Sequence, residues 1–343
     1  MKIDFKKDNG PVDERIYDLI RLAGDTQRPE IVRDMIIAAL KAGQEDDGQV
    51  DLKLMNTSLK EMRFTAKAFQ PYRNARKITV FGSARTRPED SIYSMGVSLG
   101  KKLAESGYMV ITGGGPGIMQ AVNEGAGQEH SFGLNIRLPF EQKANPVIEG
   151  NPRSITYKYF FNRKVAFLRE SDAIVLFPGG FGTLDEGVET LTLVQTGKRN
   201  PVPILLLEET GGTFWIKWIE FIEDTLLPGG YISKSDLALL ERLDSNDSVV
   251  ERIKRFYSRY HSLRYVGDLL VIRLRSGISQ QKVDDLRSRF SEILRPHGEI
   301  YLSGPLPEEI DEPDIKDLPR LVLDFDRKNF GGLKALIDSI NSD

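Results

Sequence analysis

Three glycine-rich turns are the segments of this sequence best suited to hold a negatively charged ligand. They span 81–85 (FGSAR), 112–119 (TGGGPGIM) and 177–186 (FPGGFGTLDE), and each follows a short apolar run and precedes a helical pattern. Glycine lets the backbone approach a ligand closely, and the free amides and dipole of a helix N-terminus attract an anion. The candidate phosphate-binding residues in these turns are Gly82, Ser83, Gly114, Gly115, Gly117, Gly179, Gly180, Gly182 and Thr183, the last through its hydroxyl.

The motifs that are missing narrow the ligand. The second turn departs from the dinucleotide fingerprint GxGxxG because Ile118 occupies the third glycine position, and no GxxxxGK[ST] phosphate loop occurs in the sequence. A single such turn is a weak signal, since it can serve tight packing between a strand and a helix. Three turns that open at one sheet edge favour a mononucleotide or a sugar phosphate over a dinucleotide.

Two charged features lie close to the third turn. Glu186 falls just inside the helix that we expect to begin near Thr183, so its carboxylate can face the same cleft. Arg163 and Lys164 lie on the preceding helix, where a guanidinium fork suits a phosphate or another anionic group. The alternative interpretation is a first-turn glutamate favoured by the helix dipole and a solvated pair of cations. The residues alone leave these two interpretations even.

The elements that must position these residues follow an alternating pattern from Lys77 onward. Short apolar runs at 78–81, 109–111, 134–136, 173–177 and 202–207 are separated by amphipathic stretches at 91–106, 117–127, 156–170 and 183–195. Buried strands separated by helices of this length are typical of a parallel sheet. The sequence therefore predicts an α/β fold with a doubly wound, Rossmann-like parallel sheet over residues 76–262, in which ligands bind at the carboxyl ends of the strands.

Two further segments flank this predicted domain. Residues 1–75 show apolar residues at helical spacing and predict a helical N-terminal extension. Residues 263–343 predict a small ferredoxin-like α+β module, with strands at 268–274, 299–302 and 321–325 and helices at 279–294 and 331–340. Such a module could serve oligomerisation or cover the main domain, or it could bind a regulatory ligand.

Composition limits the possible functions of this chain of 343 residues. Lys and Arg number 47 against 50 Asp and Glu, a net charge of −3, which argues against non-specific nucleic-acid binding. No apolar run approaches the roughly 20 residues of a membrane-spanning helix. The absence of cysteine excludes disulfides, thiol nucleophiles and cysteine metal sites, and favours a cytoplasmic protein. The three histidines are scattered, which leaves only a carboxylate-bound Mg²⁺ open as a metal site.

The second and third turns, with Arg163 and Lys164 between them, resemble the Lonely Guy (LOG) family. Residues 178–186 match its PGGxGTxxE motif, and the resemblance covers roughly residues 76–262. Members have often been labelled lysine decarboxylases, but this sequence offers no recognisable context for a pyridoxal-phosphate lysine. The resemblance implies a phosphoribohydrolase, which cleaves the N-glycosidic bond of a nucleoside 5′-monophosphate (a cytokinin riboside monophosphate or an AMP-like nucleotide) to free base and ribose 5-phosphate.

The resemblance also assigns roles to individual residues. By position, Arg163 and Glu186 match the catalytic pair, Lys164 a substrate-binding lysine and Thr192 a further ligand contact, while Gly179, Gly180, Gly182 and Thr183 match the phosphate loop. A carboxylate near the ribose suits an oxocarbenium-like transition state, and neither catalytic role requires a metal or an organic cofactor. The family implies a homodimer or a higher homo-oligomer.

Other interpretations of the same residues stay open. Gly187 stands where the family usually has leucine, and we expect it to enlarge the pocket near the base. The aromatic residues at 157 and 159–161 could stack on a base or pack in the core or a dimer interface. The flanking segments would also suit a nucleotide-binding regulatory protein with little or no hydrolysis, or a structural assembly subunit. The sequence does not identify the base.

Overall fold

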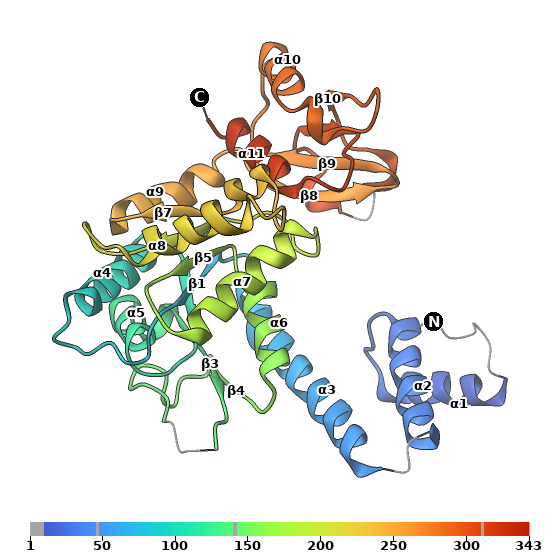
Figure 1. Ribbon diagram of the computed structural model, residues 1–343. Coiled ribbons are helices and arrows are strands. Elements are labelled where there is room, and N and C mark those ends of the chain that lie inside the picture. Colours follow the sequence, from blue (N-terminus) through green and yellow to red (C-terminus); the bar gives the residue numbers. More distant parts are fainter. Residues whose placement is uncertain (1–9, 46–47, 140–142, 310–311, 343) are drawn as a thin grey trace. The chain divides into compact units, whose positions relative to one another are not determined.

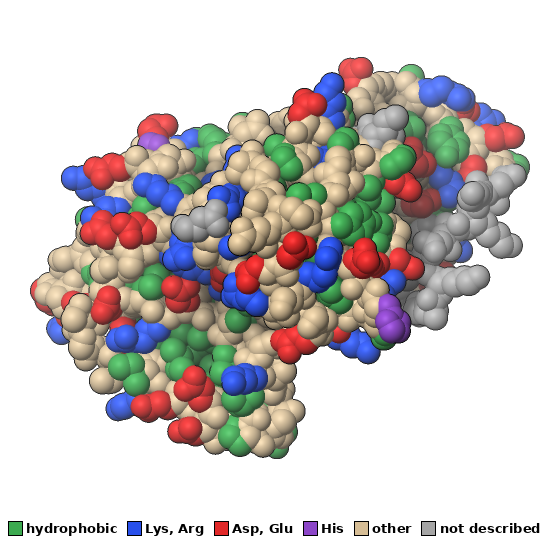
Figure 2. Space-filling model, turned by 90° about the horizontal axis from the view of Figure 1, so that it is seen from above, with side chains coloured by type: hydrophobic (Ala, Val, Ile, Leu, Met, Phe, Trp, Pro, Cys, Tyr) green, Lys and Arg blue, Asp and Glu red, His purple; other side chains and the backbone are tan. Residues whose placement is uncertain are grey.

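A computed structural model describes residues 10–45, 48–139, 143–309 and 312–342. The chain forms two compact units, Met1–Phe64 and Thr65–Asp343, which are described separately below. Acidic and basic side chains are interspersed over the face shown in Figure 2, as the near balance of the two charges predicts. Among the described residues, no helix combines the length and apolar character needed to cross a membrane.

The first unit consists of helices. These are α1 (Pro11–Ala23), α2 (Pro29–Glu45) and α3 (Gln49–Phe69), of which α3 continues into the second unit (Figure 1). Ile16 and Ile20 of α1 pack against Ile37 of α2. Beside them, Arg33 Nε and Nη2 donate to the two carboxylate oxygens of Asp13 over 2.9 and 2.7 Å, and both side chains are buried. A buried pair with two hydrogen bonds fixes how the two helices meet.

A seven-stranded parallel sheet forms the centre of the second unit. Its order is β4-β3-β2-β1-β5-β6-β7, and every neighbouring pair is parallel. The strands are β1 (Lys77–Phe81), β2 (Met109–Thr112), β3 (Ser131–Ile136), β4 (Ser154–Tyr157), β5 (Ala173–Leu176), β6 (Ile204–Leu207) and β7 (Glu241–Leu243). The predicted doubly wound α/β fold is confirmed. The chain moves outward from β1 to β4 and then returns to β5 beside β1, so the strand order reverses between β1 and β5.

Helices cover both faces of this sheet (Figure 1). The first face carries α4 (Ser91–Glu105), α5 (Ile118–Ala126) and α9 (Asn246–Phe256), packed on strand residues such as Ile78 and Val80. The second face carries α6 (Phe160–Glu170), α7 (Phe181–Gln195), α8 (Phe214–Phe221) and the end of α3, packed on residues such as Ile174 and Leu176. Alternate residues of one strand therefore enter different cores, which is the pattern of a sheet buried on both sides.

A second, four-stranded antiparallel sheet forms the C-terminal part. Its order is β10-β11-β9-β8, with β8 (Tyr260–Val266), β9 (Leu269–Leu274), β10 (Ile300–Ser303) and β11 (Arg320–Leu323). Helices α10 (Gln280–Arg289) and α11 (Phe330–Ile340) share one apolar core with this sheet. The α+β character is as predicted, and the strand order is that of a ferredoxin-like sheet in which β8 takes the place of the last strand. The division of the chain at residues 75 and 262 stays a prediction.

Three strands of the structure were not predicted, and all three lie at sheet edges. β4 has four residues, and the sequence analysis assigned its second half to a helix; β7 has three residues with no buried position. In β8 the buried positions are Tyr260, Leu263 and Val266: the register shifts between Tyr260 and Ser262, and Leu263 and Val266 belong to different apolar clusters. This spacing of three hides the alternation by which a strand is recognised.

Candidate active site

A pocket of about 860 Å³ lies where the strand order reverses. The loops that follow β1 and β5 meet there, and the Ser83 amide donates to the Pro178 carbonyl over 3.3 Å. The side of a doubly wound sheet at which the strand order reverses is where ligands bind. Eight of the predicted site residues line the pocket: Gly82, Ser83, Arg163, Gly179, Gly180, Gly182, Thr183 and Glu186.

The third glycine-rich turn opens directly into this pocket. Gly180 caps the N-terminus of α7, and its carbonyl accepts from the amides of Thr183 and Leu184. No described residue accepts from the amides of Phe181 and Gly182, which leaves two donors at the positive end of the helix dipole. A Cβ added at Gly180 or Gly182 would meet no atom within 4 Å, so the space above this turn is open. The turn can therefore accept an anion.

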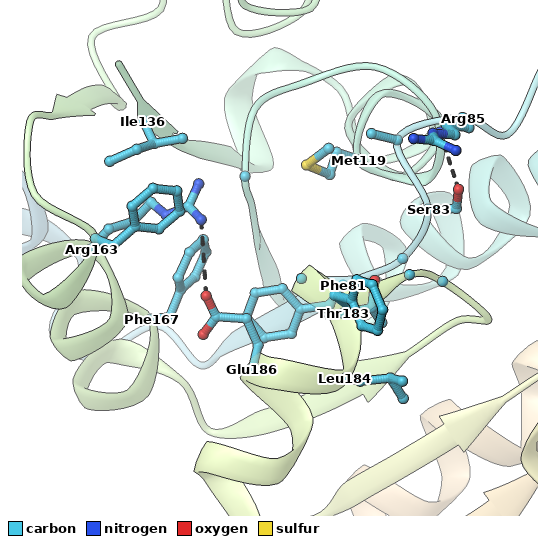
Figure 3. A pocket seen from close by; sticks show the side chains of 18 of the residues that line it. Phe81, Ser83, Arg85, Met119, Ile136, Arg163, Phe167, Thr183, Leu184 and Glu186 are labelled. Carbon is cyan, nitrogen blue, oxygen red and sulfur yellow. Dashed lines mark hydrogen bonds and ion pairs between the residues drawn. The ribbon is translucent and has the colours of Figure 1, made fainter. Parts of the chain in front are cut away.

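Glu186 and Arg163 both line the pocket, and their side chains face each other. Glu186 lies one turn into α7, and Arg163 lies on α6; Figure 3 shows the two side chains pointing toward one another. Arg163 Nη2 is 3.9 Å from Glu186 Oε1, and the exposed fractions of the two side chains are 15% and 5%. Glu186 Oε2 and Arg163 Nε are buried and have no hydrogen-bond partner among the described residues. Buried polar atoms of this kind are uncommon and are expected where a substrate completes the site.

The buried position of Glu186 changes its ionisation. Burial raises the pKa of this carboxyl to about 7, although Lys164 and Arg163 act in the opposite direction. Burial also lowers the pKa of Arg163, against the attraction of Glu186. Glu186 is thus near half ionised at neutral pH, which is the range in which a carboxyl group can both accept and donate a proton.

Lys164 lies beside this pair but does not line the pocket. Its Nζ is 2.7 Å from a carboxylate oxygen of Glu189, 2.8 Å from Asp185 and 3.7 Å from Glu186. Burial by itself favours the neutral amine, but the hydrogen bonds to Asp185 and Glu189 outweigh it, so the pKa of Lys164 is raised. In this structure Lys164 forms ion pairs with carboxylates of α7, and its predicted contact with substrate stays a prediction.

The second glycine-rich turn has a different place in the site. Gly113 and Met119 line the pocket, whereas Gly114, Gly115 and Gly117 do not. The carbonyls of Gly114 and Gly115 accept from the amide and the Nδ2 group of Asn145. A Cβ on Gly117 would lie 2.2 Å from the Ser83 carbonyl oxygen, so this turn packs tightly against the first turn. These three glycines shape the backbone beneath the pocket.

Two other expectations also concern residues outside the pocket lining. Thr192 is exposed on α7, and its hydroxyl donates to the Val188 carbonyl over 2.9 Å. Gly187 is buried, and a Cβ there would lie 3.1 Å from Leu176 Cδ1. The missing side chain at 187 therefore allows α7 to pack closely on β5, and the expectation that it enlarges the pocket is wrong.

Much of the remaining lining is apolar, and the part that lies outside the three turns was not predicted, apart from Phe160. It comprises Phe81, Met119, Ile136, Leu138, Phe160, Phe167, Phe181, Leu184 and Phe214, together with Ala84, Arg85 and Asn135. The Arg163 guanidinium carbon lies over the Phe160 ring, 4.9 Å from the centroid of that ring. The end of β3, where Asn135 and Ile136 lie, could have been inferred, because the carboxyl ends of parallel strands meet at one sheet edge. Among the described residues, no three carboxylate or imidazole groups gather where they could hold a metal ion.

The fold and the site define a Rossmann-like α/β protein with an open, anion-accepting helix N-terminus beside a buried carboxylate. A family described as "Possible lysine decarboxylase" matches residues 119–253. The cytokinin riboside 5′-monophosphate phosphoribohydrolase LOG of Oryza sativa subsp. japonica is 30% identical over 191 residues, covering 54% of this chain and 75% of the rice protein. The corresponding LOG3 enzyme of Arabidopsis thaliana is 26% identical over 186 residues, covering 53% and 83%.

This chain belongs to the LOG family of phosphoribohydrolases. The residues that match the family description, 119–253, lie within the second compact unit. They include Arg163, Glu186 and the third turn. Among solved structures, the molybdenum cofactor carrier protein of Chlamydomonas reinhardtii is 20% identical, covers 53% of this chain and 97% of its own, and has a TM-score of 0.37.

Proposed function

We propose that this protein hydrolyses the N-glycosidic bond of a nucleoside 5′-monophosphate and releases the free base and ribose 5-phosphate. The observation that carries the proposal is the position of Glu186, a buried carboxylate with one oxygen that accepts no hydrogen bond from the described residues, four residues after Gly182 in the same helix. Residues four apart lie on one face of a helix. The helix that offers amides to a phosphate therefore presents Glu186 on the same side. Along the helix axis, Glu186 lies roughly 6 Å from Gly182, which leaves room for a ribose between the phosphate and the carboxylate.

The phosphate binds at the start of α7 in this proposal. The free amides of Phe181 and Gly182 and the hydroxyl of Thr183 donate to its oxygens, and the helix dipole favours its charge. Open space above Gly180 and Gly182 leaves room for a tetrahedral group. These contacts hold the ribose of the nucleotide next to Glu186. Binding of the phosphate therefore positions the scissile bond beside the carboxylate.

Glu186 and Arg163 carry out the chemistry in this proposal. As the bond between C1′ and the base nitrogen lengthens, positive charge develops on the ribose, and the ionised carboxylate of Glu186 stabilises it. Water adds its oxygen to C1′; Glu186 accepts the proton of this water and returns it to the departing nitrogen, so that it ends in its starting form. A pKa of about 7 suits both transfers. The positive charge of Arg163 increases the ionised fraction of Glu186, and the contact at 3.9 Å orients the carboxylate.

The relatives indicate which nucleotides to test. The rice and Arabidopsis proteins are named for cytokinin riboside 5′-monophosphates, whose base is an N6-substituted adenine. Most of the pocket lining that does not belong to the glycine-rich turns or the catalytic pair is apolar, which suits a base with an apolar substituent as well as adenine itself. Our proposal therefore covers both hormone activation and nucleotide salvage, and the preferred base separates them.

The test measures release of free base from a panel of nucleoside monophosphates that includes AMP and its N6-isopentenyl derivative. We expect Glu186→Gln to lower kcat by about 10²–10⁴-fold, the usual contribution of a general acid–base group. In the unmodified protein, kcat/KM should fall as the pH drops below about 7, since Glu186 becomes protonated. The control is Glu105→Gln, whose side chain is 62% exposed at the end of α4 and should leave the rate unchanged.

Two outcomes would contradict the proposal. Equal rates for Glu186→Gln and the unmodified protein would remove Glu186 from the reaction. Tight binding of monophosphates without release of any base would instead identify a nucleotide-binding regulatory protein built on the same fold.

We also propose that the protein acts in the cytoplasm as a homo-oligomer. Phe161 and Val165 of α6 and Val188 of α7 are apolar and 45–48% exposed, although they neighbour the site. Apolar side chains spaced along exposed helix faces are suited to an interface between copies of the chain. Light scattering coupled to size-exclusion chromatography tests this, and a monomer at micromolar concentration would contradict it.

A further inference from the structure

The end of β3 contributes one polar residue, Asn135, to a part of the pocket whose other lining residues are apolar. Asn135 lines the pocket together with Ile136 and Leu138 from the same segment and with Met119 from the start of α5. Figure 3 shows Ile136 and Met119 on the wall above Glu186. In a mostly apolar part of a pocket, a polar amide can fix the orientation of a ligand through a hydrogen bond, whereas the apolar residues only bury its surface.

The orientation of the Asn135 amide is set by two neighbours. Its Nδ2 group donates to Ser154 Oγ of β4 over 3.1 Å. Its Oδ1 atom lies against Gly114: a Cβ added at Gly114 would be only 2.4 Å from Oδ1, and Gly114 has a φ of +68°, a conformation that other residues rarely adopt. Gly114 is therefore required for the place of this amide, although it does not itself line the pocket.

The oxygen of this amide has unused hydrogen-bonding capacity. No described residue donates to Asn135 Oδ1, whereas the nitrogen is already paired with Ser154. An amide oxygen accepts up to two hydrogen bonds and donates none. Because Asn135 lines the pocket, this oxygen is the group of Asn135 that can accept a hydrogen bond from a ligand at the end of β3.

We propose that Asn135 determines base specificity, by accepting a hydrogen bond from an exocyclic amino group of the base. This inference rests on the proposed function, because it takes the ligand to be a nucleoside monophosphate with its phosphate at α7. Adenine and N6-substituted adenines carry an N–H at this position of the ring, whereas hypoxanthine carries a carbonyl oxygen there. Two acceptors facing each other leave both without a partner, so the 6-oxo base is disfavoured.

AMP and IMP test the inference, because they differ in this one substituent. We expect kcat/KM for AMP to exceed that for IMP by about tenfold or more, as the loss of one hydrogen bond at a partly exposed site implies. Asn135→Leu should lower the value for AMP by about the same factor and change that for IMP less than threefold. Asn135→Asp retains acceptor oxygens and should still prefer AMP, which separates loss of the acceptor from damage to the wall.

Binding measurements keep this inference distinct from the proposed hydrolysis. Dissociation constants for AMP and IMP are measured on Glu186→Gln, with and without Asn135→Leu. If the unmodified protein releases no base, but AMP binds Glu186→Gln more tightly than IMP and Asn135→Leu abolishes the difference, the hydrolase proposal fails and the role of Asn135 stands. Equal affinities, or a preference for IMP, would overturn the role of Asn135, the latter by showing that the nitrogen faces the base. Absence of binding to both nucleotides would overturn both proposals.

Discussion

The second and third glycine-rich turns follow parallel strands of one sheet, yet they do different things in the structure. In the third turn, a Cβ at Gly180 or Gly182 would meet no described atom within 4 Å, and the amides of Phe181 and Gly182 donate to no described residue. In the second turn, a Cβ at Gly117 would lie 2.2 Å from the Ser83 carbonyl, and one at Gly114 would lie 2.4 Å from Asn135 Oδ1. One turn is open to a ligand, and the other is filled by its own neighbours.

This difference shows that glycine marks two separate needs. Where space beyond the Cα atom is empty, the missing side chain gives a ligand access to the backbone. Where that space is occupied, the missing side chain lets two backbone segments touch, and the effect on the site is indirect. Gly117 holds the first turn, whose Ser83 carbonyl also accepts from the Ile118 amide over 3.0 Å. The sequence pattern is the same in both cases, and only the surroundings of each Cα separate them.

Alanine substitutions should separate the two turns, with the largest effect at Gly117. Gly117→Ala places a methyl group on a residue with φ +70° and against a backbone oxygen, neither of which can move far. We expect it to lower the free energy of unfolding by about 3–5 kcal/mol, from backbone strain and overpacking together. Urea denaturation followed by circular dichroism measures this. A loss below about 1 kcal/mol would mean that the two turns are not rigidly packed.

Gly182→Ala is the matched variant in the third turn. Because Gly182 lies in the first turn of α7 with open space above it, alanine should leave stability unchanged or raise it by up to about 1 kcal/mol. Its methyl group would occupy the space that we assign to the phosphate, so base release or nucleotide affinity should fall although the protein is folded. An active, fully stable Gly182→Ala protein would contradict the assignment of this turn to the phosphate.

The next prediction concerns Glu186 of α7, whose burial lowers the stability of the folded chain at neutral pH. Glu186 has a pKa of about 7 in the folded chain against an ordinary value of 4.5. Between these values the unfolded chain releases a proton that the folded chain retains, so Glu186 lowers stability as the pH rises from about 4.5 to 7. Glu186→Gln removes this loss and should be more stable than the unmodified protein at pH 8, by at most about 3 kcal/mol. Arg163 and Lys164 lose a counter-charge, which reduces the gain.

The pH dependence distinguishes this effect from a general change in packing. The advantage of Glu186→Gln should shrink when unfolding is measured at pH 5, because the native carboxyl is then protonated and neutral as well. Glu105→Gln, at an exposed position, should show no such dependence. A constant difference between pH 5 and pH 8 would show that burial does not raise the pKa of Glu186.

Much of the central architecture could be predicted from the sequence, because it follows from local patterns. Buried runs such as 173–177 and the helices between them gave the doubly wound sheet, and the known geometry of such sheets places the turns after β1 and β5 side by side. Arg163 and Glu186 were chosen from charge, helix position and a family motif, and they do meet in one pocket. The reason is that each lies on a helix whose register is fixed by its apolar face.

The features that were missed depend on contacts between distant segments. The edge strand β4 is recognisable only through its pairing with β3, which no local pattern of four residues reveals. The ion pairs of Lys164 with Asp185 and Glu189, more than twenty residues away in sequence, were likewise not predicted, and its contact with substrate stays a prediction. Gly187 was expected to enlarge the pocket, but it packs on Leu176 of the neighbouring strand. Which face of a helix meets which neighbour is a property of packing.

Thr192 gives the smallest predicted effect and limits how far along α7 the site extends. It lies six residues after Glu186, is exposed, and uses its hydroxyl to bond the carbonyl four residues earlier. Thr192→Val keeps the shape of the side chain and removes only this bond, so stability should change by no more than about 0.5 kcal/mol and kcat/KM by less than twofold. A loss of tenfold or more in kcat/KM, in a protein of unchanged stability, would show that Thr192 contacts the ligand and that the site continues well beyond the first turn of α7. Because the open amides and Glu186 lie within that first turn and a half, we expect the functional part of the helix to end there.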